Sequence, residues 1–175
     1  MTVSIVPRCI AGLLLPLLLA CGSSNGGTAG FPITSPVANV CTLLTLSEAQ
    51  GVVPTVNTFA VDPTQDTADS WSRICHFANS QNSPFTNLDL VIQGALTDRG
   101  GVALQSLLST GLGSSHTAVS GVGEQAVFFD QTGTDQGLIA KSRGYLVDVT
   151  VYFASPAATA QQLTPAVNAA IGRLP

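Results

Sequence analysis

Charged side chains are scarce in this sequence, which has 6 Lys and Arg and 10 Asp and Glu among 175 residues. The basic residues form no cluster, so the chain has no obvious electrostatic surface for a nucleic acid. The same scarcity leaves few groups for acid–base chemistry, and the only histidines are His76 and His116. We therefore expect no nucleic-acid partner, no metal or cofactor, and no enzymatic activity.

The sequence also lacks a long apolar run. The segment Ile10–Ala20 has eleven residues, whereas a membrane-spanning helix needs about 20. A short apolar segment after Arg8 with a small residue at its end is typical of a signal peptide. Together with Cys21 and the Gly/Ser-rich residues after it, the segment Leu18–Ala20 resembles the lipobox of bacterial lipoproteins.

The lipobox resemblance implies removal of residues 1–20 and a diacylglyceryl group on the sulfur of Cys21. Two acyl chains hold a protein firmly on a membrane. We expect Cys21 and the Gly/Ser/Pro-rich residues to 39 to form a lipidated, flexible tether, followed by a globular domain over 40–175. The predicted location is the outer face of the cell membrane. A plain secretory signal cleaved near Ala20 is the alternative.

Cysteine counting predicts one disulfide. Of the four cysteines, Cys9 would leave with the signal peptide and Cys21 would carry the lipid. This leaves Cys41 and Cys75 as a pair in an exported domain, where disulfides persist. A metal site is the rival interpretation, but two distant cysteines without a paired CxxC lack the usual ligand spacing.

Residue periodicity predicts an α+β domain. The capping box at Thr45–Glu48 predicts a helix over 46–53, and leucine spacing predicts another over 98–110. A last helix is expected to open at Ser155–Pro156 and, because of Pro165, to kink or to restart with Thr164 as its cap. Alternating apolar residues indicate strands over 71–77, 88–93, 125–130, 138–142 and 145–153. The predicted fold is an antiparallel sheet of about five strands, packed by N-terminal, middle and C-terminal helices in a single disulfide-stapled domain.

Three features occur in an order that resembles a known family: the segment Asn39–Ala49, a second cysteine on a Trp-containing strand, and the segment Val119–Ala126. They look like a family of actinobacterial cell-envelope lipoproteins defined by a domain of unknown function. The resemblance implies an α/β sandwich similar to the Mog1/PsbP fold. It supplies no catalytic residues to transfer to this chain.

No catalytic motif has its required context. The G-x-S-x-G letters at 22–26 lie in the expected tether, and the looser match at 140–144 is followed by a strand rather than a helix. A metal site would require the fold to bring His76 and His116 together with a carboxylate such as Asp89 or Asp148. The aspartates Asp62, Asp66 and Asp69 are expected in a solvated loop. Of the large aromatics, Trp71 and Tyr145 are expected in the core, and Tyr152 is expected to be exposed.

We therefore expect a membrane-anchored, non-catalytic binding domain of the cell envelope. Its partners would be the membrane, through Cys21, and an unknown envelope protein or small ligand. One alternative is a carrier that holds a lipid or glycolipid in an apolar cavity. A cell-wall hydrolase is another.

Overall fold

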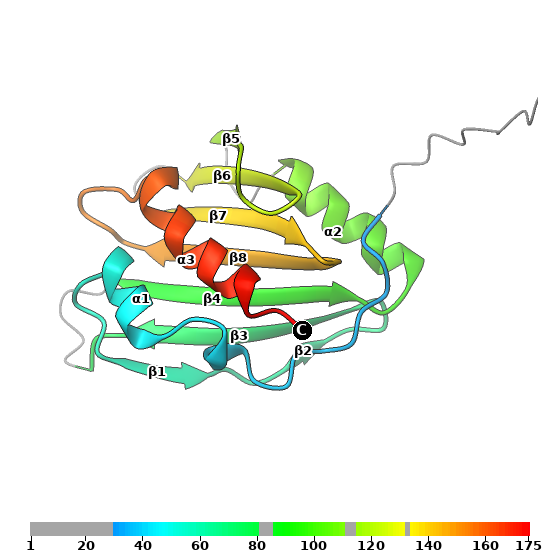
Figure 1. Cartoon of the computed structure of the whole chain (residues 1–175), viewed down its shortest axis with the longest axis horizontal. Coiled ribbons are helices and arrows are strands. Elements are labelled where there is room, and N and C mark those ends of the chain that lie inside the picture. Colours follow the sequence, from blue (N-terminus) through cyan, green and yellow to red (C-terminus); the bar gives the residue numbers. More distant parts are fainter. Residues whose placement is uncertain (1–29, 81–85, 111–114, 132–133) are drawn as a thin grey trace, which may run out of the picture.

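The computed structural model describes residues 30–80, 86–110, 115–131 and 134–175. An antiparallel sheet of eight strands forms the centre of the domain (Figure 1). The strand order is β1-β3-β4-β8-β7-β6-β5, and β2 also pairs with β3. The strands are β1 (Thr58–Val61), β2 (Gln65–Asp66), β3 (Ser70–Ala78), β4 (Asn87–Ala95), β5 (Ser115–Val119), β6 (Gln125–Gln131), β7 (Asp135–Ser142) and β8 (Tyr145–Tyr152).

The α+β class and the antiparallel sheet are confirmed, but the expected number of about five strands is too low. The three additional strands are β1, β2 and β5, at the two sides of the sheet. They are short, and nearly all their residues are exposed. Because no face of these strands is buried, they carry no alternation of apolar and polar residues that would predict them.

Helices cover both faces of the sheet. The short 3-10 helix η1 (Val40–Thr42), α1 (Leu46–Val52) and α3 (Ala160–Gly172) lie on one face, which also carries the disulfide and is here called the disulfide face (Figure 1). Helix α2 (Asp98–Thr110) packs on the opposite face, here called the α2 face. The sheet is therefore the middle layer of three.

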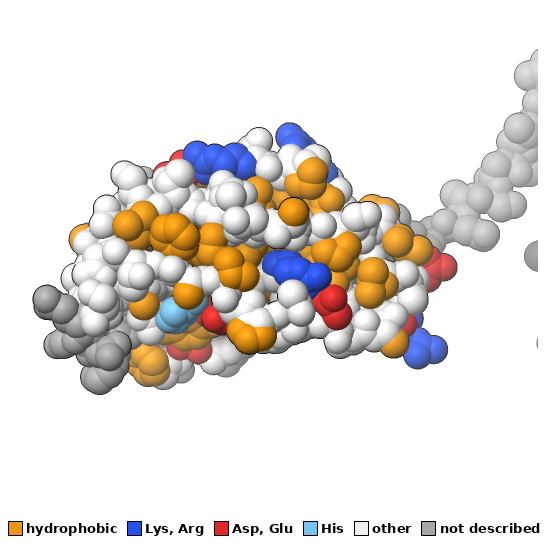
Figure 2. Space-filling view, turned by 90° about the horizontal axis from the view of Figure 1, so that it is seen from below, with side chains coloured by type: hydrophobic (Ala, Val, Ile, Leu, Met, Phe, Trp, Pro, Cys, Tyr) orange, Lys and Arg blue, Asp and Glu red, His pale blue; other side chains and the backbone are white. Residues whose placement is uncertain are grey.

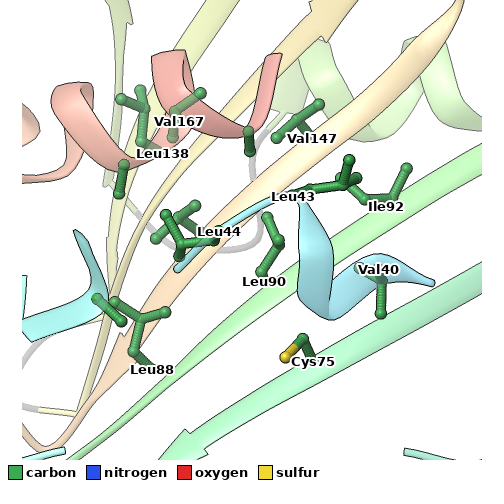
Figure 3. Close-up of a cluster of buried hydrophobic side chains, with 14 of the residues drawn as sticks. Val40, Leu43, Leu44, Cys75, Leu88, Leu90, Ile92, Leu138, Val147 and Val167 are labelled. Carbon is green, nitrogen blue, oxygen red and sulfur yellow. The ribbon is translucent and has the colours of Figure 1, made fainter. Parts of the chain in front are cut away.

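The larger core lies on the disulfide face. Alternate residues of β4 and β8 point into it, because successive side chains of a strand leave opposite faces. They meet apolar residues of η1, α1 and α3 (Figure 3). The fully buried members include Leu44, Phe77, Leu88, Leu90, Ile92, Leu138, Val147, Val149, Leu163 and Val167.

A smaller core lies under α2. Leu104 and Leu108 of the helix pack with Phe129, Ile139 and Leu146 of the sheet. Most of the helix's contacts are with β4, and fewer are with β6 and β7. The α2 face is therefore only partly covered by this helix.

The folded domain includes part of the segment expected to be a tether. Phe31 and Val37 are buried, and Ile33 forms a bridge to Ala95 at the end of β4. The indole nitrogen of Trp71 donates to the carbonyl of Thr34 at 2.9 Å. These residues share the Gly/Ser/Pro-rich composition of the expected tether, so composition did not identify them as packed.

The last helix starts later than expected. It begins at Ala160 with Thr159 as its N-cap, and the side chains of Thr159 and Gln162 form a capping box. The Ser155–Pro156 pair therefore lies before the helix instead of opening it. Pro165 lies inside the helix and is exposed. No helix among the described residues is long and apolar enough to cross a bilayer.

Candidate functional site

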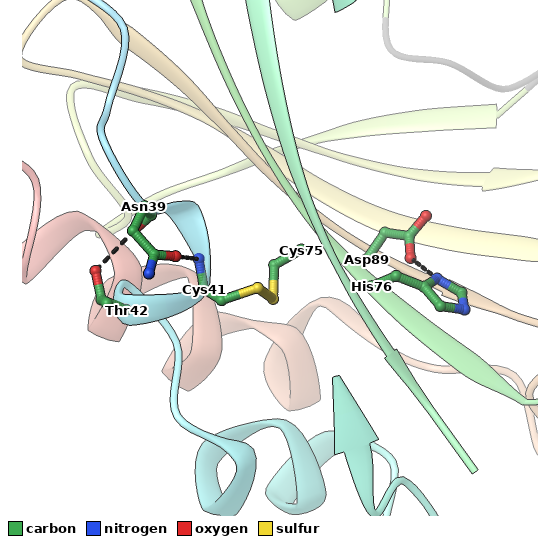
Figure 4. The surroundings of a disulfide bond; sticks show 6 residues. All are labelled: Asn39, Cys41, Thr42, Cys75, His76 and Asp89. Atoms are coloured by element: carbon green, nitrogen blue, oxygen red, sulfur yellow. Dashed lines mark hydrogen bonds and ion pairs between the residues drawn. A yellow bond between two sulfur atoms is a disulfide. The ribbon is translucent and has the colours of Figure 1, made fainter. Parts of the chain in front are cut away.

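Cys41 and Cys75 form the predicted disulfide, with their Cα atoms 5.1 Å apart (Figure 4). Both cysteines are buried. The backbone N–H of Cys41 donates to the side-chain oxygen of Asn39, which caps η1. The bond therefore ties the N-terminal side of the domain to the centre of β3, which is a structural role. Cys21, the predicted lipid site, lies outside the described residues.

A polar cluster on the α2 face is the strongest candidate for a functional site. We call it the His–Asp cluster, and it consists of His76, Asp89, Asp148, Thr150 and Tyr152. His76 lies opposite Asp89 in the β3–β4 pair, and Asp89 lies opposite Thr150 in the β4–β8 pair. Asp148 and Tyr152 lie two residues to either side of Thr150 on the same face. Three neighbouring strands therefore bring the cluster together.

Hydrogen bonds connect these side chains in two groups. His76 Nδ1 and Asp89 Oδ1 lie 2.5 Å apart (Figure 4). The Tyr152 side chain also interacts with the Asp89 carboxylate and acts to lower the pKa of Asp89. The Thr150 hydroxyl donates to Asp148 Oδ1 at 2.8 Å. Asp89 is thus held by His76 on the neighbouring strand, and Asp148 is held by Thr150.

Burial changes the acidity of the cluster. Asp148 is 6% exposed, and desolvation raises its pKa to about 7, although the Thr150 hydrogen bond acts in the opposite direction. Desolvation also raises the pKa of Asp89, against the effect of its bond to His76. The pKa of Tyr152 is raised by burial and by the nearby carboxylates. The buried carboxyl group of Asp148 therefore changes its charge near neutral pH.

His76 provides the accessible part of the cluster. Its side chain is 34% exposed, compared with 16% for Asp89. The bond from Nδ1 to Asp89 fixes the ring, and the opposite edge of the ring points away from Asp89 (Figure 4). A carboxylate that orients an imidazole in this way prepares the second ring nitrogen to bind a ligand or to exchange a proton.

The fold separates the two histidines. His116 lies on β5, where it is exposed and opposite Phe129. His76 is on β3 and His116 is on β5, and the four strands β4, β8, β7 and β6 lie between them in the sheet. Five strand spacings correspond to about 24 Å, which is too far for a shared metal ion. Within the described part of the chain, no group of three or more His, Cys, Asp or Glu side chains could hold a metal.

The aspartates of the 62–69 segment have mainly structural partners. Asp66 pairs with both terminal nitrogens of Arg73, and this hydrogen bonding lowers the pKa of Asp66. Asp69 accepts from the Thr97 hydroxyl and lies 3.7 Å from Arg99. The segment itself contains β2, so only its remaining residues form the expected loop.

The aromatic and serine candidates do not form a further site. Trp71 and Tyr145 are buried, as expected, and their rings meet edge-on. Tyr152, expected to be exposed, is half-buried because it belongs to the His–Asp cluster. Ser142 is buried at the end of β7, before the Arg143–Gly144 hairpin turn. It lacks the strand-to-helix turn of a hydrolase nucleophile, and the other G-x-S-x-G match lies outside the described residues.

Three surface grooves border the disulfide face. One of about 330 Å³ lies between the end of α1 and the 154–158 segment. Another of about 370 Å³ lies between β5, β6 and the start of α3. The third, of about 450 Å³, lies beside Tyr145, Arg173 and the 35–39 segment. All three open to solvent, so none of them is the enclosed dry cavity that a lipid carrier requires.

Sequence analysis named Asp89 and Asp148 as carboxylates that could join a histidine, but it did not predict the cluster. The available signal was the alternation of β3, β4 and β8, which puts polar residues on one face. The register that brings them together was not evident from that alternation. No family model, curated protein or solved structure matches this chain.

Proposed function

We propose that this protein is a lipid-anchored binding domain on the outer face of the cell membrane, and that it binds its ligand or partner at the His–Asp cluster. The observation that carries the proposal is the placement of Asp89 and Asp148 on the incompletely covered α2 face. A buried carboxylate destabilises a fold compared with an apolar side chain of similar size. Such groups occur preferentially at functional sites.

The charges of the cluster favour a particular class of ligand. Asp62 and Asp135 lie close enough to the cluster to influence its titration. Four carboxyl groups therefore lie in or near a cluster that contains one histidine, on a protein with few charges. This excess of acceptors favours a ligand or protein segment that presents positive charge or several hydrogen-bond donors.

The hydroxyl groups favour binding rather than bond cleavage. Thr150 is buried and donates to Asp148, and the Tyr152 hydroxyl is engaged by Asp89. Neither hydroxyl is arranged next to His76 as a nucleophile that this imidazole could deprotonate. His76 would instead contact a bound ligand through its outer edge.

In-cell crosslinking with mass spectrometry tests the binding site. Cells producing the wild type should yield a specific neighbour, and the Asp89→Asn variant should capture at least several-fold less of it. Asp98→Asn is the matched control, because it removes an exposed carboxylate at the start of α2, away from the cluster. Equal capture by all three proteins would remove the cluster from the proposal.

Detergent partitioning tests the anchor separately. The wild type should enter the detergent phase, and Cys21→Ser should remain in the aqueous phase. Mass measurement of the native protein should show a lipid on Cys21. An aqueous wild-type protein with a free Cys21 thiol would contradict the membrane location.

A further inference from the structure

The end of the domain where the chain enters carries an apolar surface, which we call the entry patch. It consists of the exposed side chains Ile33, Leu96 and Val102, with exposed fractions of 62%, 38% and 63%. They are three of the six exposed large apolar side chains in the described residues. Figure 2 shows hydrophobic side chains at this end of the domain, on the right of the view.

Backbone contacts hold the three elements of the patch together. Thr34 N–H donates to the Ala95 carbonyl at 3.0 Å, which places Ile33 beside the β4 end that precedes Leu96. Phe31 N–H donates to the Gly101 carbonyl at 3.2 Å, next to Val102. A Cβ atom on Gly101 would lie 2.3 Å from the Phe31 carbonyl oxygen, so the two backbones are in direct contact. The entry patch therefore rests on a well-packed base.

The short segment between Cys21 and Gly30 limits how far the entry patch can lie from a membrane anchor. Gly30 is the ninth residue after Cys21. A segment of nine residues spans at most about 30 Å when fully extended. With a lipid on Cys21, this end of the domain would remain close to the headgroups. The bilayer is then present at high local concentration.

We propose that the entry patch rests in the headgroup region of the membrane, an inference that depends on the lipid anchor proposed above. Three apolar side chains bind a bilayer weakly by themselves, but an anchor makes the contact intramolecular. Arg99, Lys141 and Arg143 lie at this end, together with the acidic residues Asp69, Asp98 and Glu124. Because the three basic and three acidic side chains cancel in charge, the contact between the entry patch and the membrane does not depend on anionic lipid.

The orientation places the His–Asp cluster away from the membrane. Asp89 and Ala95 are six residues apart along β4, which corresponds to about 20 Å along the strand. With the entry patch on the bilayer, the cluster and the Phe153 end of β8 face the interior of the envelope. A partner could reach them without displacing lipid.

Fluorescent labelling of the lipidated full-length protein tests this orientation. A polarity-sensitive dye is attached to Val102→Cys in one sample and to Phe153→Cys in another, each reconstituted in phosphatidylcholine vesicles. Phe153 is the matched control because it is 58% exposed at the opposite end. We expect about twofold stronger quenching by spin-labelled phospholipid at position 102, since exposed apolar side chains enter the headgroup boundary. Adding Ile33→Ser and Leu96→Ser should reduce that difference.

Equal, water-like emission at both positions in a protein with a verified lipid would overturn the membrane orientation and leave the anchor intact. A response at position 102 that requires anionic lipid would also contradict it, because the patch has no net charge. If mass measurement shows no lipid on Cys21, the anchor and the orientation both fail.

Discussion

Cys75 and His76 are consecutive in β3, but their side chains lie on opposite faces of the sheet (Figure 4). Cys75 joins the buried core on the disulfide face, and His76 meets Asp89 on the α2 face. The alternation of a β-strand thus separates the residue that stabilises the domain from the residue proposed to bind a ligand. Substitutions at the two positions can therefore be used to test stability and binding independently.

Asp148 should make stability depend on pH near neutrality. Its pKa rises from 3.8 to about 7 on folding, so between these values the folded state binds the proton more tightly than the unfolded state. The free energy of unfolding should fall as pH rises through this range. Asp148→Asn should remove that slope and raise stability at pH 8 by up to a few kcal/mol, because one pKa unit corresponds to about 1.4 kcal/mol.

The measurement is urea unfolding followed by the emission of the single tryptophan, Trp71, which is buried. Asp98→Asn serves as the control and should keep the wild-type slope, because its carboxylate is exposed. A wild type whose stability is constant between pH 5 and pH 8 would contradict the prediction.

The disulfide should contribute strongly to stability. It closes a loop with a sequence separation of 34 residues, for which chain entropy predicts about 3–4 kcal/mol. The Cys41→Ala/Cys75→Ala double variant should unfold at a correspondingly lower urea concentration. A reducing agent should destabilise the wild type and leave the double variant unchanged. Equal stability of the two oxidised proteins would show that the bond contributes little.

Gly137 should not tolerate a side chain. A Cβ atom there would lie 2.3 Å from the Phe129 ring and 2.6 Å from the Thr150 hydroxyl. Overpacking of this kind costs about 1–3 kcal/mol, so Gly137→Ala should lower the thermal midpoint. Gly51→Ala is the matched control, because its Cβ would meet no atom within 4 Å. In helix α1 that change should stabilise by up to about 1 kcal/mol. If both variants match the wild type, the predicted clash at β7 is absent.

Glu48 and Arg173 should stabilise the contact between α1 and α3 at neutral pH. Their two hydrogen bonds are each 2.8 Å long, and they help to lower the Glu48 pKa to about 2. The contribution is therefore present above about pH 4.5 and is lost as pH falls towards 2. A double-mutant cycle with Glu48→Gln and Arg173→Gln should give about 0.5–1 kcal/mol of coupling at pH 7. Coupling that persists at pH 2 would contradict this assignment.

Local sequence patterns predicted the features that depend on neighbouring residues, such as helix caps and the face of a strand to which a residue belongs. The Thr45–Glu48 capping box is present, and the alternation in β3 correctly placed Trp71 and Cys75 in the core. The predicted start of α3 is wrong, because Ser155–Pro156 resembles a first helical turn but lies before the helix. The side-chain bonds between Thr159 and Gln162 instead fix the start of the helix.

The His–Asp cluster could not be predicted in the same way. Its members depend on the β3–β4 and β4–β8 registers, and Asp89 and Thr150 are 61 residues apart in the chain. A shift of one residue in either pair would move half of the cluster to the other face. Alternation within one strand assigns a face to each residue but does not assign its neighbour across the sheet.

The disulfide also has a mechanical consequence if the chain is anchored ahead of Gly30. Tension between the membrane and the domain would first act on the hydrogen bonds of residues 31–34. These bonds would break one after another. Once residues 31–41 were extended, the force would act on Cys41. The disulfide would then transmit it to the middle of β3. The covalent link would stop unravelling at Cys41, and the load would then act on β3 beside His76 of the proposed binding site.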